Sequence, residues 1–363
     1  MTQPALQPAF TPCFDAAALP HDYGDVRTEY EALLRDTALL ELSPTGKLAI
    51  SGKNAVQFIN GLVSNDVKAL AVCAGVFAAF PNLQGKVAAL AYIYNLGDAG
   101  LLFELDASNR AKIVKNLSRF VPAGEFFLTD ATEQLALLSL QGPRSAELLS
   151  NLTGQTISFT TERRINDVTI AQTRVRLATR ARAGTVGFDL FVPVEAAAAV
   201  WQTLLAHGAH AAGQTALDIA RLEAGIPREP LDVNENFIIN ETGLTEAVSY
   251  TKGCYLGQEV IARIHWRGQP AKQLRGLWID AAEPPATGAE LWATDEKGVS
   301  KKVGEITSSV RSVALNRVIA FGYVHRYFLN AGTQFTLRHN ELEFGQAQLA
   351  ETPFTTNQNG TTN

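Results

Sequence analysis

The sequence is poor in cysteine and has no long apolar run. Its three cysteines, Cys13, Cys73 and Cys254, are widely spaced and form no disulfide framework, which fits a reducing cytoplasm. No apolar stretch approaches the roughly 20 residues needed to span a bilayer. The N-terminal stretch also lacks the basic segment and apolar core of a secretory signal. We therefore expect a cytoplasmic protein that has no membrane-spanning helix.

An excess of positive charge is also missing. The formal net charge is −5, which argues against non-specific electrostatic binding to nucleic acid or anionic lipid. Hydrophobic residues make up 46% of the 363 residues and charged residues 18%, as in ordinary globular proteins. This length predicts two or three domains with a sizeable core.

The pattern of residues along the chain predicts four regions. Residues 1–25 are rich in proline and alanine and indicate a flexible arm. Residues 26–267 mix helical and strand periods, beginning with a helical spacing over 26–42. Short strand-like runs separated by Gly, Pro, Asn or Asp over 268–350 are typical of a small β-barrel, and the polar segment 351–363 is typical of a disordered tail. The fold class is therefore α+β followed by a β-barrel.

Local signals within the second region are specific. Strand-like runs cover residues 75–80, 86–94 and 100–105, and Asp106 is suited to cap the helix that follows. The stretches "LAISGKNAVQFINGL" and "LSLQGPRSAELLSNL" match as strand, glycine and helix. They predict two related units, with Gly52 and Gly142 at tight turns and Pro143 at the first helical position. Chance similarity between short apolar patterns is the alternative.

The stretch "TKGCYLGQEV" places one of the few cysteines between two glycines. Glycine allows a sharp turn and close approach of a ligand, and a nearby ammonium favours the thiolate that a nucleophile or metal ligand requires. The alternative is a buried cysteine that packs as a small hydrophobe. One cysteine cannot close a zinc or iron–sulfur site alone, so any metal bound by Cys254 would be shared with a partner or held only transiently. The candidate residues of this motif are Lys252, Gly253, Cys254, Tyr255, Gly257, Gln258 and Glu259.

The motif "KGCYLGQE" matches the signature of the YgfZ family, which resembles the folate-binding T-protein, the aminomethyltransferase of the glycine cleavage system. Further pieces follow in the order of that superfamily, among them "LVSNDV", "LLSLQGP", "GFDLFVP" and "ARLEAGIP". The resemblance covers roughly residues 26–350. It implies a three-lobed fold with a C-terminal barrel and a central hole that holds tetrahydrofolate.

The resemblance also implies a function. A YgfZ-like protein is expected to assist assembly or repair of iron–sulfur clusters in client enzymes, including enzymes that modify tRNA. Cys254, with its thiolate favoured by Lys252, would then react with or briefly ligate iron or sulfur. The alternative is a folate-dependent one-carbon (aminomethyl) transferase. Against it, Ala88, Ala89 and Leu90 stand where the T-protein has its acidic pair, and these side chains cannot exchange a proton.

Two residues match family positions near folate. Asp189 of "GFDLFVP" takes the place of a pterin-holding glutamate, and Arg221 of "ARLEAG" matches an arginine near the ligand. The alternatives are an exposed strand aspartate, and a helix-surface salt bridge of Arg221 with Asp218 or Glu223. The basic and aromatic stretch "ARIHWRG", residues 262–268, is either a surface for RNA or a partner, or a solvated hinge.

Overall fold

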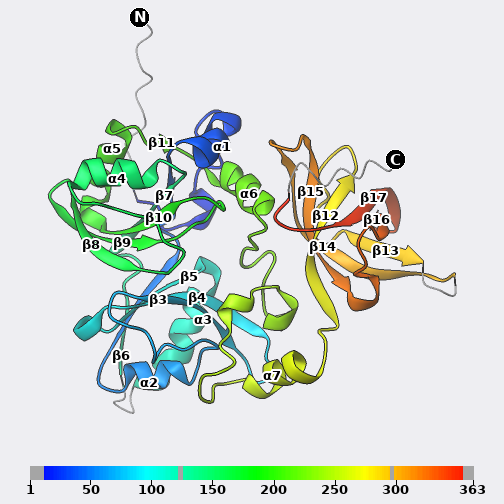
Figure 1. Ribbon diagram of the computed structural model, residues 1–363, viewed down its shortest axis with the longest axis horizontal. Helices are drawn as coiled ribbons and strands as arrows, with labels where there is room; N and C mark the ends of the chain where they lie inside the picture. The colour runs from blue at the N-terminus through cyan, green and yellow to red at the C-terminus, as the bar shows by residue number, and fades with distance from the viewer. Residues whose placement is uncertain (1–11, 122–125, 295–297, 355–363) are drawn as a thin grey trace, which may run out of the picture.

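The computed structural model describes residues 12–121, 126–294 and 298–354, which form three lobes. Figure 1 shows two α+β lobes on the left, one above the other, and a β-barrel on the right. The expected α+β fold with a C-terminal barrel is confirmed. Among the residues that the structure describes, no helix is long and apolar enough to cross a membrane.

The upper lobe is built on a six-stranded sheet in the order β11-β1-β7-β10-β9-β8. Helices α4 and α5 cover one face of this sheet and bury a core that includes Leu138, Leu190 and Trp201. Its elements are α1 (Val26–Arg35), β1 (Ala38–Glu41), β7 (Leu135–Gln141), α4 (Ser145–Thr153), β8 (Ile165–Ile170), β9 (Thr173–Thr179), β10 (Gly187–Pro193), α5 (Ala197–Ala206), β11 (His210–Ala211) and α6 (Gln214–Glu223).

The helix expected over residues 26–42 is wrong in its second half. Helix α1 ends at Arg35, and residues 38–41 form strand β1 between β7 and β11. All four residues of β1 are buried. Hydrogen bonds and burial in the sheet therefore override the local helical spacing.

The lower lobe is built on a five-stranded sheet in the order β3-β4-β5-β2-β6. The three strands expected between residues 75 and 105 are confirmed to within about one residue. Asp106 caps α3 as predicted, because its carboxylate accepts from the Ser108 N–H at 2.9 Å. The elements of this lobe are β2 (Gly46–Ser51), α2 (Ala55–Asn60), β3 (Gly75–Pro81), β4 (Val87–Asn95), β5 (Leu101–Leu105), α3 (Ala107–Ser118) and β6 (Phe127–Asp130).

The two matched stretches of sequence adopt the same strand–turn–helix form, one in each lobe. The turn glycines have nearly equal backbone angles, φ +116° at Gly52 and +120° at Gly142. A Cβ on Gly142 would lie 2.3 Å from the Asp36 carbonyl oxygen, so no larger residue fits there. Pro143 is not the first helical residue as predicted, because α4 begins only at Ser145.

The third lobe is a closed barrel in the order β12-β15-β14-β13-β16-β17. Its strands are β12 (Lys272–Asp280), β13 (Glu290–Thr294), β14 (Ser300–Ser312), β15 (Arg317–His325), β16 (Gln334–His339) and β17 (Leu342–Ala350). Helix α7 (Gln258–Arg267) precedes it. Short 3-10 helices are η1 (Ala16–Ala18), η2 (Gly97–Ala99), η4 (Val194–Ala196), η5 (Ile239–Glu241), η6 (Thr245–Ala247) and η7 (Arg326–Phe328).

Both ends of the described chain pack on α6. The Pro20 and His21 carbonyls accept from N–H groups at the start of α6. At the other end, Phe354 is buried against Trp278, and its N–H donates to the Glu223 carbonyl at 2.8 Å. Parts of the predicted arm and tail are therefore bound to the fold. Residues 1–11 of the arm and 355–363 of the tail lie outside the described residues.

Candidate functional site

The cysteine motif forms an exposed loop directly before α7. Cys254 is exposed, and Gly257 caps α7 with φ +76°. A Cβ on Gly257 would lie 2.3 Å from the Asn82 carbonyl oxygen, so the loop packs against the turn between β3 and β4. That turn holds Gly85, which precedes the positions of the missing acidic pair. The structure thus places the cysteine motif against the turn that leads into Ala88, Ala89 and Leu90.

The other motif residues shape this loop. Tyr255 is buried, and its N–H donates to the Gln258 side-chain oxygen at 3.3 Å. Glu259 is exposed in the first turn of α7, and Gly253 is exposed beside the cysteine.

Lys252 has a structural role that the sequence did not indicate. Its ammonium is buried and donates to three backbone carbonyls, those of Asn60, Val63 and Asn65, at 2.6, 2.8 and 2.7 Å. Burial lowers the pKa of Lys252 to about 8. The three protons of the ammonium hold the segment after α2, and none is donated to a thiol. The expected effect of Lys252 on Cys254 therefore stays a prediction.

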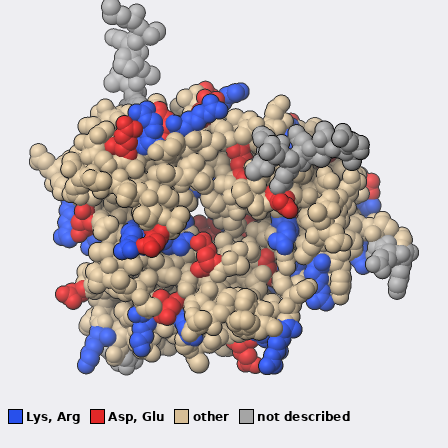
Figure 2. Space-filling model, in the orientation of Figure 1, with Lys and Arg blue, Asp and Glu red and all other residues tan. Residues whose placement is uncertain are grey.

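A cluster of charged and polar side chains lies between the two facing sheets of the upper and lower lobes. We call Tyr94, Glu104, Arg180, Arg182 and Asp189 the central polar cluster. Tyr94 and Glu104 lie on β4 and β5, Asp189 lies on β10, and the two arginines follow β9. Figure 2 shows a hollow near the middle of the molecule, between these lobes.

Asp189 is fully buried and already paired within this cluster. Arg182 donates to both of its carboxylate oxygens, at 2.9 and 2.6 Å, and the Ser139 hydroxyl donates to one of them at 2.7 Å. Arg182 also donates to Glu104 at 2.9 Å and so joins the two sheets. A pterin contact of Asp189 stays a prediction. A pterin bound there would have to share the carboxylate oxygens with Arg182 and Ser139.

Three buried polar atoms of the cluster have no hydrogen-bond partner among the described residues. They are the Tyr94 hydroxyl, the second carboxylate oxygen of Glu104 and the Nε of Arg180. The Arg180 Nε lies 3.9 Å from that Glu104 oxygen and 4.0 Å from an Asp189 oxygen, and its guanidinium stacks 3.3 Å from the centre of the Tyr92 ring. Buried polar groups are normally satisfied, so these atoms leave room for hydrogen bonds to a water molecule or a ligand.

The charge of Glu104 is maintained in this setting. Burial alone would raise the pKa of its carboxyl, but Arg182 and Arg180 reverse the effect and hold the pKa below its usual value. Glu104 is therefore an ionised acceptor at neutral pH.

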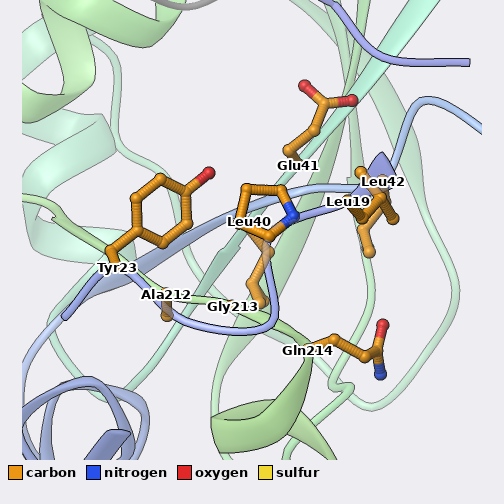
Figure 3. A pocket seen from close by; sticks show the side chains of 9 residues that line it. Leu19, Tyr23, Leu40, Glu41, Leu42, Ala212, Gly213 and Gln214 are labelled. Atoms are coloured by element: carbon orange, nitrogen blue, oxygen red, sulfur yellow. The ribbon is translucent and has the colours of Figure 1, made fainter. Parts of the chain in front are cut away.

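Glu41 and Lys47 extend the cluster toward the N-terminal segment. Burial raises the pKa of Glu41 to about 7 and lowers that of Lys47 to about 7. One carboxylate oxygen of Glu41 is buried without a partner among the described residues. Figure 3 shows Glu41 beside a pocket that Leu19 and Tyr23 help to line. Its volume of about 10 Å³ suits a single water molecule and not a substrate.

Arg221 lies elsewhere, between α6 and the barrel. It donates to Asp218 at 2.8 Å and to Asp232 at 2.6 Å, and Asp232 in turn accepts from Thr307 and Ser308 of β14. Asp218 is one of the two partners that the sequence offered as alternatives to folate. The predicted folate contact of Arg221 stays a prediction, while its observed contacts dock the third lobe.

The positions of the missing acidic pair lie on β4. Ala88 and Leu90 are on the face of β4 that also carries Tyr92 and Tyr94. The nearest acid found there comes from another segment: Glu229 accepts from the Leu90 N–H and from the Asn109 side chain. Burial raises the pKa of Glu229 to about 8. Both groups that Glu229 contacts, the Leu90 backbone and the Asn109 amide, belong to the fold and hold the carboxyl in place.

The sequence pattern had missed most of the central polar cluster. Glu104 and Glu41 each stand among apolar residues in a buried strand, in "LLFEL" and "ALLE". A single acidic residue within an apolar strand was the signal in the sequence that could have identified Glu104 and Glu41. No group of three or more His, Cys, Asp or Glu residues in the described part of the chain is arranged to hold a metal ion.

Comparisons with known proteins agree over both α+β lobes and the barrel. The model of the GCVT N-terminal domain matches residues 9–252, and that of the glycine cleavage T-protein C-terminal barrel domain matches residues 272–355. The chain is 33% identical to an aminomethyltransferase of Thermus thermophilus over 86% of each chain. It is 25% identical to an aminomethyltransferase of Halalkalibacterium halodurans, covering 94% of this chain and 93% of the relative.

A solved structure shows the same fold. It is that of glycine cleavage system aminomethyltransferase T from Bartonella henselae, with a TM-score of 0.81 and 21% identity. The match covers 93% of this chain and 92% of that chain. The expected three-lobed T-protein-like fold is thereby confirmed.

The contacts of Lys252 predict a loss of stability in Lys252→Met. Methionine keeps the length of the side chain but leaves three backbone carbonyls without their donor, so we expect the free energy of unfolding to fall by at least about 2 kcal/mol. Urea unfolding measures it. The control is Lys53→Met at an exposed lysine near α2, which should change stability by less than about 0.5 kcal/mol. Equal losses in both variants would contradict the role assigned to Lys252.

The raised pKa of Glu229 predicts a pH-dependent stability. The folded state binds this proton more tightly than the unfolded state, so its contribution to stability is complete below about pH 4.5 and is lost as pH rises to about 8. Glu229→Gln resembles the protonated form at all pH values. Unfolding should be measured at several pH values. The free energy of unfolding of the variant, relative to that of the wild-type protein, should rise by a few kcal/mol as pH increases across this range. A constant difference would contradict the prediction.

Proposed function

The chain belongs to the glycine cleavage T-protein family, and on this premise we propose that it binds tetrahydrofolate at the central polar cluster and acts on the one-carbon unit that folate carries. The observation that carries the proposal is the set of buried atoms on Tyr94, Glu104 and Arg180 that have no hydrogen-bond partner among the described residues. Tyr94 and Glu104 belong to the lower lobe, and Arg180 follows β9 in the upper lobe.

The chemistry of these atoms suits a pterin. A pterin edge offers ring N–H and amino donors beside a carbonyl acceptor. The free oxygen of Glu104 would accept from such donors, and the Arg180 Nε would donate to the carbonyl. Asp189 would act through Arg182, which it orients. This assignment moves the main pterin contact from Asp189, the residue expected from sequence, to Glu104.

Aminomethyl transfer is the activity that the names of the relatives suggest. Bound tetrahydrofolate supplies the carrier for the one-carbon unit in such chemistry. Because β4 has Ala88, Ala89 and Leu90 in place of the acidic pair, proton exchange would fall to Glu41 and Lys47. Both groups have pKa values near 7, so each can donate and accept a proton at neutral pH.

The binding site is tested by anaerobic calorimetric titration of tetrahydrofolate into the wild-type protein and Tyr94→Phe. The Tyr94 hydroxyl has no partner within the described fold, so its removal should leave stability intact. It should weaken folate binding about fivefold to tenfold, through one lost hydrogen bond. Tyr327→Phe, at an exposed tyrosine next to the barrel strands, is the control and should bind like the wild type.

Three outcomes are informative. No binding by the wild-type protein would refute the folate proposal, and equal binding by Tyr94→Phe would place the ligand elsewhere. If folate binds, the wild-type protein is assayed for methylene-tetrahydrofolate formed from an aminomethylated carrier protein. Intact binding without this product would refute transfer and leave a folate-binding protein.

The second candidate function rests on Cys254. Its thiol is exposed on a loop that packs against the β3–β4 turn, where a client protein or a sulfur or iron donor can reach it. We propose that, as expected of a YgfZ-like protein, this thiol assists assembly or repair of iron–sulfur clusters in client enzymes, tRNA-modifying enzymes among them. A reducing compartment such as the cytoplasm would keep the thiol free.

Complementation tests this second candidate. In cells that lack the native protein, Cys254→Ala should lose most of the support for iron–sulfur enzyme activity, while the protein stays at its normal level. Cys13→Ala is the control, because that cysteine lies in the N-terminal segment, far from the motif in sequence, and should retain full support. Full activity with Cys254→Ala would rule out a mechanism that uses the thiol.

A further inference from the structure

A separate groove lies between α7, the segment that contains η5 and η6, and the start of β12. Its volume is about 440 Å³, within the range of small-molecule sites. Polar residues on its walls include Asn240, Glu241, Tyr250, His265, Gln273 and Arg275, and apolar side chains such as Ile239 and Leu244 lie between them. Figure 1 shows α7, which carries Ile264 and His265 of the lining, at the bottom of the view.

Arg275 brings an uncompensated positive charge to this groove. Its guanidinium is half-buried and donates only to the Leu274 carbonyl and the Gln273 side chain. No ion pair joins it to an acid in the described part of the chain, although Glu241 also lines the groove. Burial lowers the pKa of Arg275 because nothing opposes the loss of water. An anion bound in the groove would supply the missing partner.

Asn240 provides a second unsatisfied group. Its Nδ2 donates to the Ile261 carbonyl and the Tyr250 hydroxyl, both at 3.3 Å. The carbonyl can only accept, so the orientation of the amide is determined. The Oδ1 is then buried with no donor among the described residues. A ligand N–H or O–H would satisfy it.

The groove also has an aromatic wall. The rings of Tyr250 and His265 are stacked with centres 3.7 Å apart and an angle of 15° between their planes. Outside the lining of the groove, Trp266 stands edge-on to His265, with centres 4.6 Å apart. A planar ring can stack on such a surface.

We propose that this groove binds a small organic anion in which a carboxylate or phosphate lies near a planar ring that bears a hydrogen-bond donor. The anionic group pairs with Arg275, the donor meets the Asn240 Oδ1, and the ring packs against His265. This site is independent of the folate site, because no residue of the central polar cluster lines the groove. It also gives the "ARIHWRG" stretch a role that is neither a hinge nor a surface for long nucleic acid.

The test uses the full chain and four probes: inorganic phosphate, benzoate, adenosine 5′-monophosphate and p-aminobenzoyl-glutamate. Binding is measured by ligand-observed NMR, with tetrahydrofolate binding followed in parallel. The wild-type protein should bind adenosine 5′-monophosphate or p-aminobenzoyl-glutamate, which combine an anion, a ring and a hydrogen-bond donor, more tightly than phosphate, which has no ring, or benzoate, which has no donor. Adenosine 5′-monophosphate carries a phosphate and p-aminobenzoyl-glutamate carries carboxylates, so comparing their affinities shows which anionic group the groove prefers.

Variants of Arg275 decide the assignment. Arg275→Gln keeps the length of the side chain but not its charge, and should weaken probe binding about tenfold to a hundredfold, with partial rescue in Arg275→Lys. Arg326→Gln, on η7 outside the groove, is the control and should change nothing. Unfolding curves confirm that the variants fold. Unchanged affinity in Arg275→Gln, or no saturable binding of any probe in the millimolar range, would overturn the proposal.

Unchanged tetrahydrofolate binding in Arg275→Gln is expected. If folate and probe binding were lost together, the groove would be part of the folate site and its independence would be refuted.

Discussion

Burial of charge between two facing sheets is the constraint on which the rest of the structure depends. Asp189 and Glu104 come from different lobes, and Arg182 pairs with both. A buried carboxylate is stable only when it is paired, and Glu104 of the lower lobe finds this partner in Arg182 of the upper lobe. Around this ion-pair bridge, the Tyr94 hydroxyl and the Arg180 Nε have no hydrogen-bond partner among the described residues.

The third lobe is held by an equivalent arrangement on α6. Arg221 pairs with Asp232, which accepts from the hydroxyls of β14. Two residues further along, the Glu223 carboxylate accepts from Tyr30 of α1 and Ser312 of β14. A single helix thus uses buried polar contacts to join the upper lobe to the barrel. Polar contacts require a defined geometry, so they specify one relative placement of the lobes where apolar packing alone would allow several.

The cysteine loop and the central polar cluster are two different kinds of site. The cluster is enclosed, charged and shared by two lobes, as suits recognition of a polar ring. Cys254 is exposed, on a loop that lies against the β3–β4 turn at Gly257 and that Lys252 ties to the segment after α2. This turn leads into β4, whose far end carries Tyr94, so the strand connects the two sites. In this chain the family fold has kept a polar centre while its β4 acids are absent and a thiol lies beside the turn.

The sequence by itself determined the features that depend on residues close together along the chain. Strand and helix periods, the Asp106 cap, the repeated strand–glycine–helix unit and the barrel follow from local spacing, because backbone conformation and one-sided burial act over a few residues. Only the tertiary structure decided that residues 38–41 form a strand, that Lys252 serves three carbonyls and that the free carboxylate oxygen belongs to Glu104 and not to Asp189. The pairing of residues 38–41 with β7, the contacts of Lys252 and the pairing of Glu104 with Arg182 all join segments that are far apart along the chain. Local pattern shows which residues are buried, but the partner of a buried charge is set by how the sheets meet.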